Sequence, residues 1–317
     1  MRIVFMGTPA FAVPSLIALL DNGYDVVGVV TQPDRPKGRK RELTPPPVKA
    51  VAQERGIPVL QPERMRAPEA AEAVAALRPD LIVTAAYGQI LPKAVLETPR
   101  LGCVNVHGSL LPRYRGGAPI QRSIINGESV TGVTLMFMAA GLDTGDMIDR
   151  VEVAIDDADT SGTMFEKLSL AGAKLLLEWL PGLEAGTAPR ERQDEARATF
   201  APNLTRDDER LRWEQPSRAL FNRIRGLYPM AGGFTTLGGE VFKVWGCRVP
   251  EEADLKLSAS WRDAAPGSVL ETGAFGIRVR TGDGSIVLTE VQPAGKKALP
   301  AADFARGARL APGTVLG

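Results

Sequence analysis

Short apolar segments alternate with amphipathic ones along the first half of the chain, and this alternation restricts the possible folds more than any other feature. The apolar segments are rich in β-branched residues, as strands buried on both faces of a parallel sheet usually are. Strands that alternate with helices predict an α/β fold, here a Rossmann-like, doubly wound and mostly parallel sheet with right-handed crossovers. The expected strands are residues 3–6, 26–30, 81–85, 103–106 and 133–138, and the expected helices are residues 14–20, 48–55, 69–77, 118–125 and 160–183.

The second half follows a different pattern. Residues 187–205 lose periodicity and become polar, which indicates a linker. After a helix expected over residues 217–225, short strands are separated by glycine turns, and this spacing predicts a small OB-like β-barrel. We therefore expect an α/β domain over residues 1–186, the linker over 187–205 and the OB-like domain over 206–317. The expected C-terminal strands are residues 234–237, 241–249, 268–271, 276–280 and 285–291.

The composition excludes several classes of protein. Of the 317 residues, 44% are hydrophobic and 24% are charged, which is ordinary for a folded globular protein. The net charge of +1 excludes a protein that binds nucleic acid over its whole surface, so any such contact requires a local patch. Cys103 and Cys247 lie far apart and the chain has a single histidine, so we expect no zinc or other metal site.

We also expect a cytoplasmic protein that does not enter membranes. No apolar run approaches the ~20 residues that a membrane-spanning helix needs. A strand is expected from Ile3, which leaves no room for a targeting peptide before it. The loop after this strand, Gly7-Thr8-Pro9, lacks the glycine pattern of dinucleotide-binding proteins, and no Walker sequence is present. The fold class alone therefore does not indicate a nucleotide cofactor.

The single histidine, His107, stands where a functional side chain is expected. It follows the strand expected over residues 103–106, and Asn105 lies on the same side of the chain. In open α/β sheets, ligands bind beyond the carboxyl ends of the strands. An isolated histidine is more often a structural residue that satisfies a loop, and it is the surrounding motif that favours a catalytic role.

Two motifs give the chain a family resemblance. Residues 105–120 read NVHGSLLPRYRGGAPI, and residues 141–146 read GLDTGD. Both resemble the motifs of the formyltransferases that use 10-formyltetrahydrofolate. Further segments are similar to those members of the family that formylate methionyl-tRNA, and the likeness covers essentially the whole chain. These segments are residues 7–9, 31–36, 86–88, 90–94 and 292–297.

The resemblance implies that a free amine attacks a formyl carbon, which creates an oxyanion and a positively charged nitrogen. Asn105 and His107 are the expected hydrogen-bond donors to the oxyanion. By resemblance, Asp143 approaches His107, favours its charged form and helps to remove the amine proton. The alternative for Asp143 is an Asx-turn residue in a glycine-rich loop. Ser109 follows His107 too closely to form a nucleophilic triad with it, so no covalent intermediate is expected.

The same resemblance implies two loops that hold the folate, with 10-formyltetrahydrofolate as co-substrate. One loop follows His107, and the other follows the strand expected over residues 81–85, where a simple turn is the alternative reading. The expected folate-binding residues are Tyr87, Gly88, Gln89, Ile90, Ser109, Leu110, Leu111 and Pro112.

A basic segment indicates a nucleic-acid partner. Residues 35–41 carry five positive charges in seven positions, after the second expected strand and so on the side of the expected site. A charge run is usually a solvated loop, but this one resembles the loop with which the family grips tRNA. The expected tRNA contacts are Arg39, Lys40 and Arg41, together with Arg35 and Lys37 in the same segment and Lys296 and Lys297 beside the OB-like barrel.

These features together predict a monomeric enzyme that passes the formyl group of 10-formyltetrahydrofolate to the α-amine of initiator methionyl-tRNA. A UDP-amino-sugar formyltransferase is the first alternative, since it would use the same folate site, but it needs no segment with so many charges. The second alternative is a non-catalytic tRNA-binding protein. The presence of Asn105, His107 and Asp143 together argues against it.

Overall fold

The computed structural model describes residues 1–37, 42–249, 261 and 263–317 of the chain. The chain divides into two compact units, each assembled from separate stretches of sequence. Arg39, Lys40 and Arg41, which are expected to contact tRNA, lie outside the described residues. Unit 1 comprises Met1–Pro119, Val130–Ala154 and Phe165–Pro202, and unit 2 comprises Ile120–Ser129, Ile155–Met164 and Asn203–Gly317.

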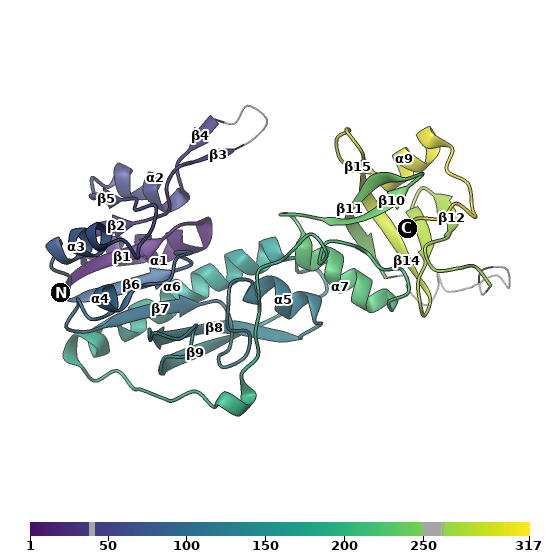
Figure 1. Ribbon diagram of the computed structural model, residues 1–317. Coiled ribbons are helices and arrows are strands. Elements are labelled where there is room, and N and C mark those ends of the chain that lie inside the picture. Colours follow the sequence, from purple (N-terminus) through teal and green to yellow (C-terminus); the bar gives the residue numbers. More distant parts are fainter. Residues whose placement is uncertain (38–41, 250–260, 262) are drawn as a thin grey trace. The chain divides into compact units, whose positions relative to one another are not determined.

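Unit 1 is built on a mixed sheet, whose described part contains seven strands in the order β5-β2-β1-β6-β7-β8-β9 (Figure 1). The first five in this order run parallel, while β8 is antiparallel to β7 and β9 is antiparallel to β8. The predicted Rossmann-like, mostly parallel architecture is confirmed, and β9 is an additional edge strand. The strands are β1 (Arg2–Gly7), β2 (Asp25–Val30), β5 (Val59–Leu60), β6 (Leu81–Ala85), β7 (Cys103–His107), β8 (Val130–Phe137) and β9 (Met147–Ala154).

Helices cover both faces of this sheet. On one face, Val4, Ile82 and Cys103 pack in a cluster with residues of α3 and α4. On the other face, α6 approaches β7 so closely that a Cβ added at Gly172 would lie 2.6 Å from Val106. No helix in the described ranges is long and apolar enough to span a membrane. The helices are η1 (Ala10–Ala12), α1 (Val13–Asp21), α2 (Pro47–Glu54), α3 (Pro68–Ala76), α4 (Lys93–Leu96), α6 (Ser161–Ala185) and η2 (Glu195–Arg197).

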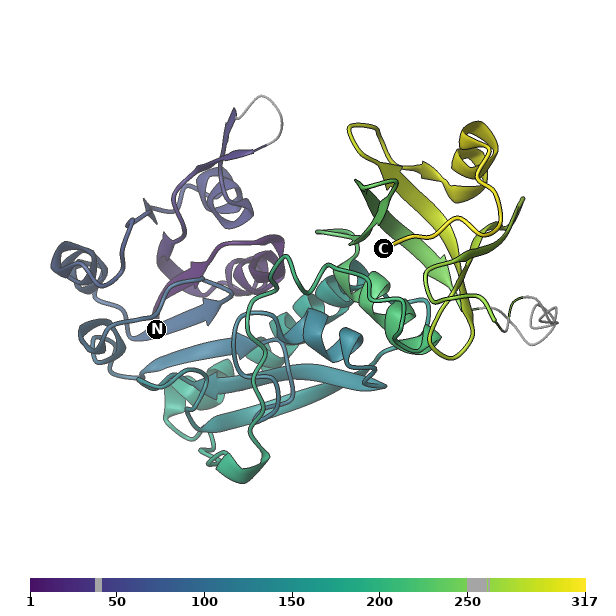
Figure 2. The same cartoon turned by 45° about the vertical axis from the view of Figure 1, so that its right-hand side comes forward.

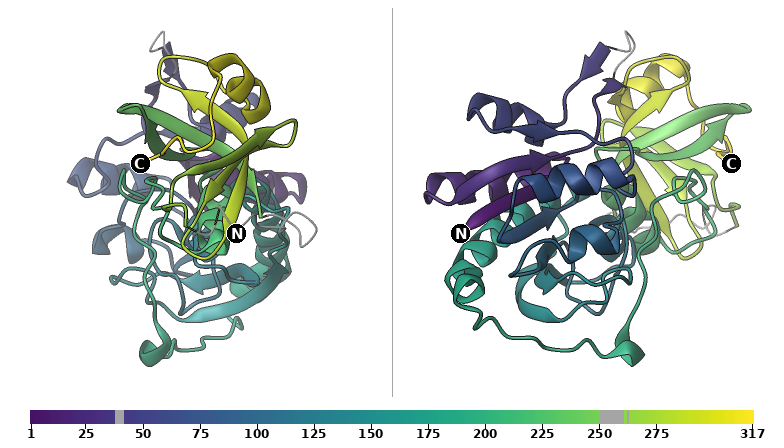
Figure 3. Two further views of the ribbon diagram at one scale, coloured as in Figure 1. Left: turned by 90° about the vertical axis from the view of Figure 1, so that its right-hand side faces the viewer. Right: turned by 60° about the vertical axis from the view of Figure 1, so that its left-hand side comes forward.

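The described part of the basic segment lies in a two-stranded antiparallel ribbon of β3 (Arg35–Lys37) and β4 (Glu42–Thr44), which projects away from the sheet of unit 1 (Figure 3). Asp34 anchors the base of this ribbon by accepting hydrogen bonds from Lys49 Nζ and Gln61 Nε2, each at 2.7 Å. The bond from Lys49 is the largest cause of the lowered pKa of the Asp34 carboxyl. Because Asp34 is held in this way, the ribbon begins at a fixed position on unit 1.

Unit 2 contains an antiparallel sheet, whose described strands follow the order β10-β11-β14-β13-β12 with β15 paired to β14. Gly238 and Gly239 both have positive φ, as the tight turn between β10 and β11 requires. The predicted run of short strands joined by glycine turns is confirmed, while α9 is an addition. The elements are α5 (Pro119–Ile125), α7 (Ser217–Leu227), β10 (Gly233–Leu237), β11 (Glu240–Arg248), β12 (Val269–Gly273), β13 (Gly276–Arg280), β14 (Ser285–Pro293), β15 (Leu299–Pro300) and α9 (Ala301–Ala308).

Candidate active site

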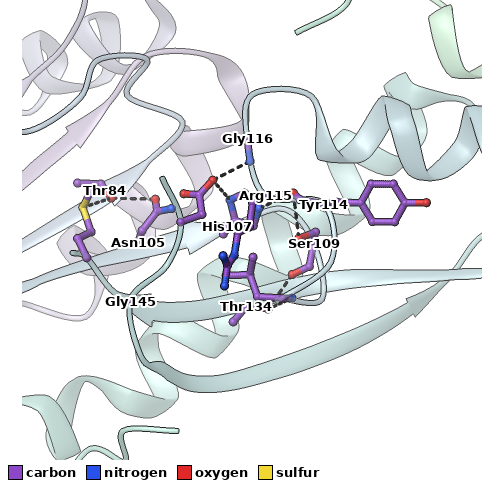
Figure 4. Close-up of polar contacts among 12 residues, drawn as sticks. Thr84, Asn105, His107, Ser109, Tyr114, Arg115, Gly116, Thr134 and Gly145 are labelled. Atoms are coloured by element: carbon purple, nitrogen blue, oxygen red, sulfur yellow. Dashed lines mark hydrogen bonds and ion pairs between the residues drawn. The ribbon is translucent and has the colours of Figure 1, made fainter. Parts of the chain in front are cut away.

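Asn105 and His107 lie at the carboxyl end of β7, where the alternation of the strand directs both side chains to one face (Figure 4). The hydroxyl of Thr84, on the neighbouring strand β6, donates to Asn105 Oδ1 at 2.8 Å. Because this bond occupies the carbonyl end of the amide, Nδ2 is the end that can donate to a ligand. Thr84 was not predicted from the sequence, because a hydroxyl near the end of an apolar strand does not by itself indicate a role.

The imidazole of His107 is 5% exposed, and its two nitrogens have different surroundings. Nε2 lies 3.1 Å from the carbonyl oxygen of Tyr114. A carbonyl oxygen only accepts hydrogen bonds, so this contact assigns a proton to Nε2. Nδ1 faces Asp143, with 3.7 Å between Nδ1 and Oδ2. At 3.7 Å the two atoms are farther apart than in a hydrogen bond, so their contact is electrostatic.

Asp143 lies in the loop between β8 and β9. Its φ of +50° is in the left-handed region, which aspartate adopts more readily than most residues. The backbone N–H of Gly116 donates to Asp143 Oδ2 at 2.8 Å, and this is the same oxygen that faces His107. The two motifs at residues 105–120 and 141–146 are therefore joined at this carboxylate.

Hydrogen bonds of buried side chains fix the conformation of the loop after His107. Ser109 is fully buried, and its hydroxyl donates to the carbonyl of Arg113 at 2.7 Å. Thr134 Oγ1 donates to the carbonyl of Ser109 at 2.7 Å and accepts from the N–H of Leu111 at 3.0 Å. These bonds engage side chains and backbone groups of the loop alike, and together they fix its shape. Of the expected folate-binding residues here, Ser109, Leu111 and Pro112 are buried and Leu110 is partly buried.

The loop after β6 contains the other expected folate-binding residues. Tyr87 is buried, which raises the pKa of its phenol to about 12, and its carbonyl accepts a hydrogen bond from Thr8 Oγ1 at 2.9 Å. Gln89 Oε1 accepts from the N–H of Met65 at 2.7 Å, so this side chain braces the loop. In contrast, Gly88 is exposed with φ of +88°, and Ile90 is 60% exposed. Glycine and isoleucine are thus the accessible members of this set.

Residues 187–202 leave α6 and run back across unit 1 through the short helix η2 (Figure 2). Their last part pairs with the loop after β7, where Arg115 N donates to Thr199 O at 2.8 Å and Ala201 N donates to Arg115 O at 2.7 Å. Gly116 has φ of +120°, and a Cβ there would lie 2.7 Å from Ala201 O. This close approach explains why glycine follows Arg115.

The expected tRNA-binding residues lie in different units. Arg35 is exposed in unit 1, where Nη2 lies 3.3 Å from Glu63 Oε2, and Lys37 ends β3. Lys296 and Lys297 are exposed in the turn between β14 and β15 of unit 2. Within the described ranges, no group of three or more His, Cys, Asp or Glu side chains is placed to hold a metal ion.

The chain matches two family models, formyl transferase over residues 1–180 and formyl transferase, C-terminal domain, over residues 203–309. It is 55% identical over 317 residues to the methionyl-tRNA formyltransferase of Bacillus subtilis, which covers 100% of this chain and 98% of the relative. It is 56% identical over 320 residues to the methionyl-tRNA formyltransferase of Geobacillus thermodenitrificans, with the same coverage. The solved N-formyltransferase of Helicobacter canadensis, in complex with folinic acid and dTDP-3-aminofucose, shares the fold. Its TM-score is 0.64 at 18% identity, over 92% of this chain and 99% of that chain.

Proposed function

The chain belongs to the formyl transferase family, and we propose that it transfers the formyl group of 10-formyltetrahydrofolate to the α-amine of initiator methionyl-tRNA. The observation that carries the proposal is the identity of more than half of the residues, over the whole chain, with methionyl-tRNA formyltransferases. The site at the end of β7 supplies the donors and the carboxylate that such a reaction needs.

The oxyanion that forms when the amine attacks the formyl carbon is met by two donors, Asn105 Nδ2 and a protonated Nδ1 of His107. This assignment is supported by the other polar atom of each side chain, which already has a hydrogen-bond partner within the protein. Thr84 occupies Asn105 Oδ1, and the carbonyl of Tyr114 occupies His107 Nε2. Donors that are fixed before the reaction lower the barrier most, because they need no reorganisation as the charge develops.

Asp143 accepts the proton that the attacking nitrogen must lose, directly or through a water molecule. The bond between the formyl carbon and N10 of the folate then breaks, and N10 takes up a proton as tetrahydrofolate leaves. Asp143 Oδ2 accepts from Gly116 N and faces His107, which leaves Oδ1 for the proton. A positioned base of this kind contributes about 10²–10⁴-fold to the rate. No covalent intermediate is needed, and the hydroxyl of Ser109 is engaged with the carbonyl of Arg113.

We expect Asn105→Ala to lower kcat about 10²–10³-fold, because one of the two oxyanion donors is lost. Thr84→Val should give a smaller loss, since it frees Asn105 Oδ1 but leaves the amide in place. Single-turnover formylation rates of the two variants test this order. Wild-type turnover by Asn105→Ala would show that this amide does not contact the oxyanion.

The folate is held by the loops at residues 87–90 and 109–112. Gly88 and Ile90 contact the folate directly, and this assignment is supported by their exposure. The side chains of Tyr87, Ser109 and Leu111 are buried and keep the loops in the shape that receives the folate. Gln89, Leu110 and Pro112 complete the set.

Residues 1–186 form the domain for folate binding and catalysis, and residues 206–317 form an OB-like domain for tRNA. Residues 187–205 connect the two, and the part of this segment up to Pro202 also belongs to unit 1. The C-terminal residues support a closed barrel, because they bond to strands at both edges of the sheet. Ser268 pairs with Val315 beside β12, and Gly317 N donates to Thr236 O of β10 at 3.1 Å. Closure of this kind removes sheet edges. The enzyme acts as a monomer in the cytoplasm, where initiator tRNA is used.

The basic segment binds the acceptor end of the tRNA through Arg39, Lys40 and Arg41. Further contacts come from Arg35 and Lys37 in the same segment and from Lys296 and Lys297 in unit 2.

Replacing Arg39, Lys40 and Arg41 together by glutamine should weaken tRNA binding while leaving folate binding unchanged. Each lost phosphate contact lowers the salt dependence of binding by about 0.7–0.9 in log–log slope. The triple variant should therefore lose about 2–3 units of slope, measured by filter binding over a range of salt.

A matched control removes lysine charge elsewhere on unit 1. Lys93 and Lys174 are 83% and 81% exposed, and Lys93→Gln with Lys174→Gln should leave the slope unchanged. Equal losses of folate and tRNA binding in the triple variant would mean that the segment has a structural role instead.

To test formylation itself, the protein is incubated with 10-formyltetrahydrofolate and methionyl-tRNA. The amino acid is then released from the tRNA and its mass is measured by mass spectrometry. We expect formylmethionine, at a rate proportional to the enzyme concentration. Release of unmodified methionine alone would refute the proposed function.

A further inference from the structure

The loop that carries Asp143 is held by a side chain that the catalytic proposal does not use. Gln193 Nε2 donates to the carbonyl of Asp143 and to the carbonyl of Gly145, each at 2.8 Å. These two carbonyls belong to the turn in which Asp143 has its left-handed backbone. Surrounding contacts must maintain such a conformation, and the amide of Gln193 supplies two of them.

The other end of this amide is fixed by Arg115, which is 2% exposed. Gln193 Oε1 accepts from Arg115 Nε at 3.0 Å and from Nη2 at 2.8 Å. The guanidinium also bonds both carboxylate oxygens of Glu195, at 2.8 and 2.9 Å. A buried guanidinium held on two sides has little freedom. Since it only donates, it also determines that the oxygen of Gln193 points towards it and the nitrogen points towards the loop.

Asp143 is therefore held at two points that converge on Arg115. Its carbonyl is bound by Gln193, and its carboxylate is bound by the N–H of Gly116, the residue next to Arg115 in the chain. Gln193, in the segment of residues 187–202, thus contributes to the site by holding the backbone of the loop that carries Asp143.

We propose that Gln193 is a positioning residue, which keeps Asp143 Oδ2 facing His107 Nδ1, and that Arg115 and Glu195 orient its amide. The inference rests on the proposed function only in treating Asp143 and His107 as the reacting groups. The alternative is a purely structural role, in which Gln193 only accepts hydrogen bonds from the buried Arg115.

Two variants separate these roles. Gln193→Glu keeps acceptors for Arg115 but loses the N–H donors to the two carbonyls, while Gln193→Met keeps the volume and loses both functions. We expect kcat to fall about 10–100-fold in both, because a displacement of about 1 Å at a reacting group costs up to about 10²-fold. KM for either substrate should change less than about 2-fold, since the lost interaction does not bind substrate. Gln53→Ala, which removes an exposed amide from α2, is the control.

The single histidine offers a readout that does not depend on activity. The imidazole of His107 is the only one in the chain, so its NMR signals report the surroundings of Nδ1 without ambiguity. At fixed pH, these signals should move in both Gln193 variants, because the carboxylate beside the ring is displaced. They should stay in place in Gln53→Ala.

Wild-type kcat in Gln193→Glu would overturn the proposal, as would unchanged imidazole signals in either folded variant. If Gln193→Met fails to fold, Gln193→Glu alone decides, because it retains the contact with Arg115. If the wild-type protein does not formylate methionyl-tRNA, the proposed function fails, while the NMR comparison still tests whether Gln193 positions Asp143.

Discussion

We expect the His107→Ala variant to lose about 10²–10⁴-fold in kcat for formyl transfer. The substitution removes the donor at Nδ1 and the group that faces Asp143 at 3.7 Å. A methyl group can neither donate to an oxyanion nor carry a charge. Rates under single-turnover conditions, with both substrates saturating, measure this loss at the chemical step.

Two controls show whether the loss arises from chemistry. The Kd for the folate should be nearly unchanged, because His107 is buried and its contacts are with Tyr114 and Asp143. His107→Gln should keep part of the rate, since its amide can donate. Near-normal turnover by a folded His107→Ala variant would contradict the catalytic role of this residue.

Asp143→Asn should lower kcat by about 10²–10⁴-fold, because it removes the base while preserving the shape of the side chain. The amide oxygen of asparagine can still accept from the N–H of Gly116, so the loop should stay in place. The variant therefore isolates the charge from the fold. Rates measured across pH show whether the loss persists where the wild-type enzyme is fully active.

Asp146 provides the matched control for this substitution. It lies in the same loop, and its carbonyl accepts from Phe137 N at 2.8 Å, which is a contact of the backbone alone. Asp146→Asn should thus retain most of the activity. If Asp143→Asn and Asp146→Asn lose the same amount, the loop is needed only for its shape, and the base is elsewhere.

The parts of the fold that follow from local pattern are the ones that sequence analysis predicted. Buried strands such as β1, β6 and β7 are mostly apolar, so their predicted positions are correct to within one or two residues. The edge strand β9 was not predicted, because the polar pair Asp149-Arg150 interrupts its apolar start and the strand follows a glycine-rich loop. Only its second half alternates, with Val151 and Val153 partly buried and Glu152 exposed, as a half-buried strand does.

The residues of the site also divide into those that stand in recognisable motifs and those that do not. Asn105, His107 and Asp143 stand in motifs, and the structure places His107 and Asp143 within 3.7 Å of each other, although their catalytic roles remain predictions. Thr84 and Gln193 have no local signal, because their roles come from partners 21 and 50 residues away in the chain. The only sequence signal of residues 187–202 is a mostly polar composition, which indicates a linker. Their hydrogen bonds to the loop after β7 depend on tertiary structure.

A comparison of acceptors tests formyl transfer to initiator methionyl-tRNA most directly. With 10-formyltetrahydrofolate as donor, kcat/KM is measured for initiator methionyl-tRNA, elongator methionyl-tRNA and a UDP-amino sugar. We expect initiator methionyl-tRNA to be preferred by about 10²-fold or more over either alternative. Transfer to the sugar alone would keep the site chemistry but contradict the proposed acceptor, and transfer to none of the three would contradict the proposed function as a whole.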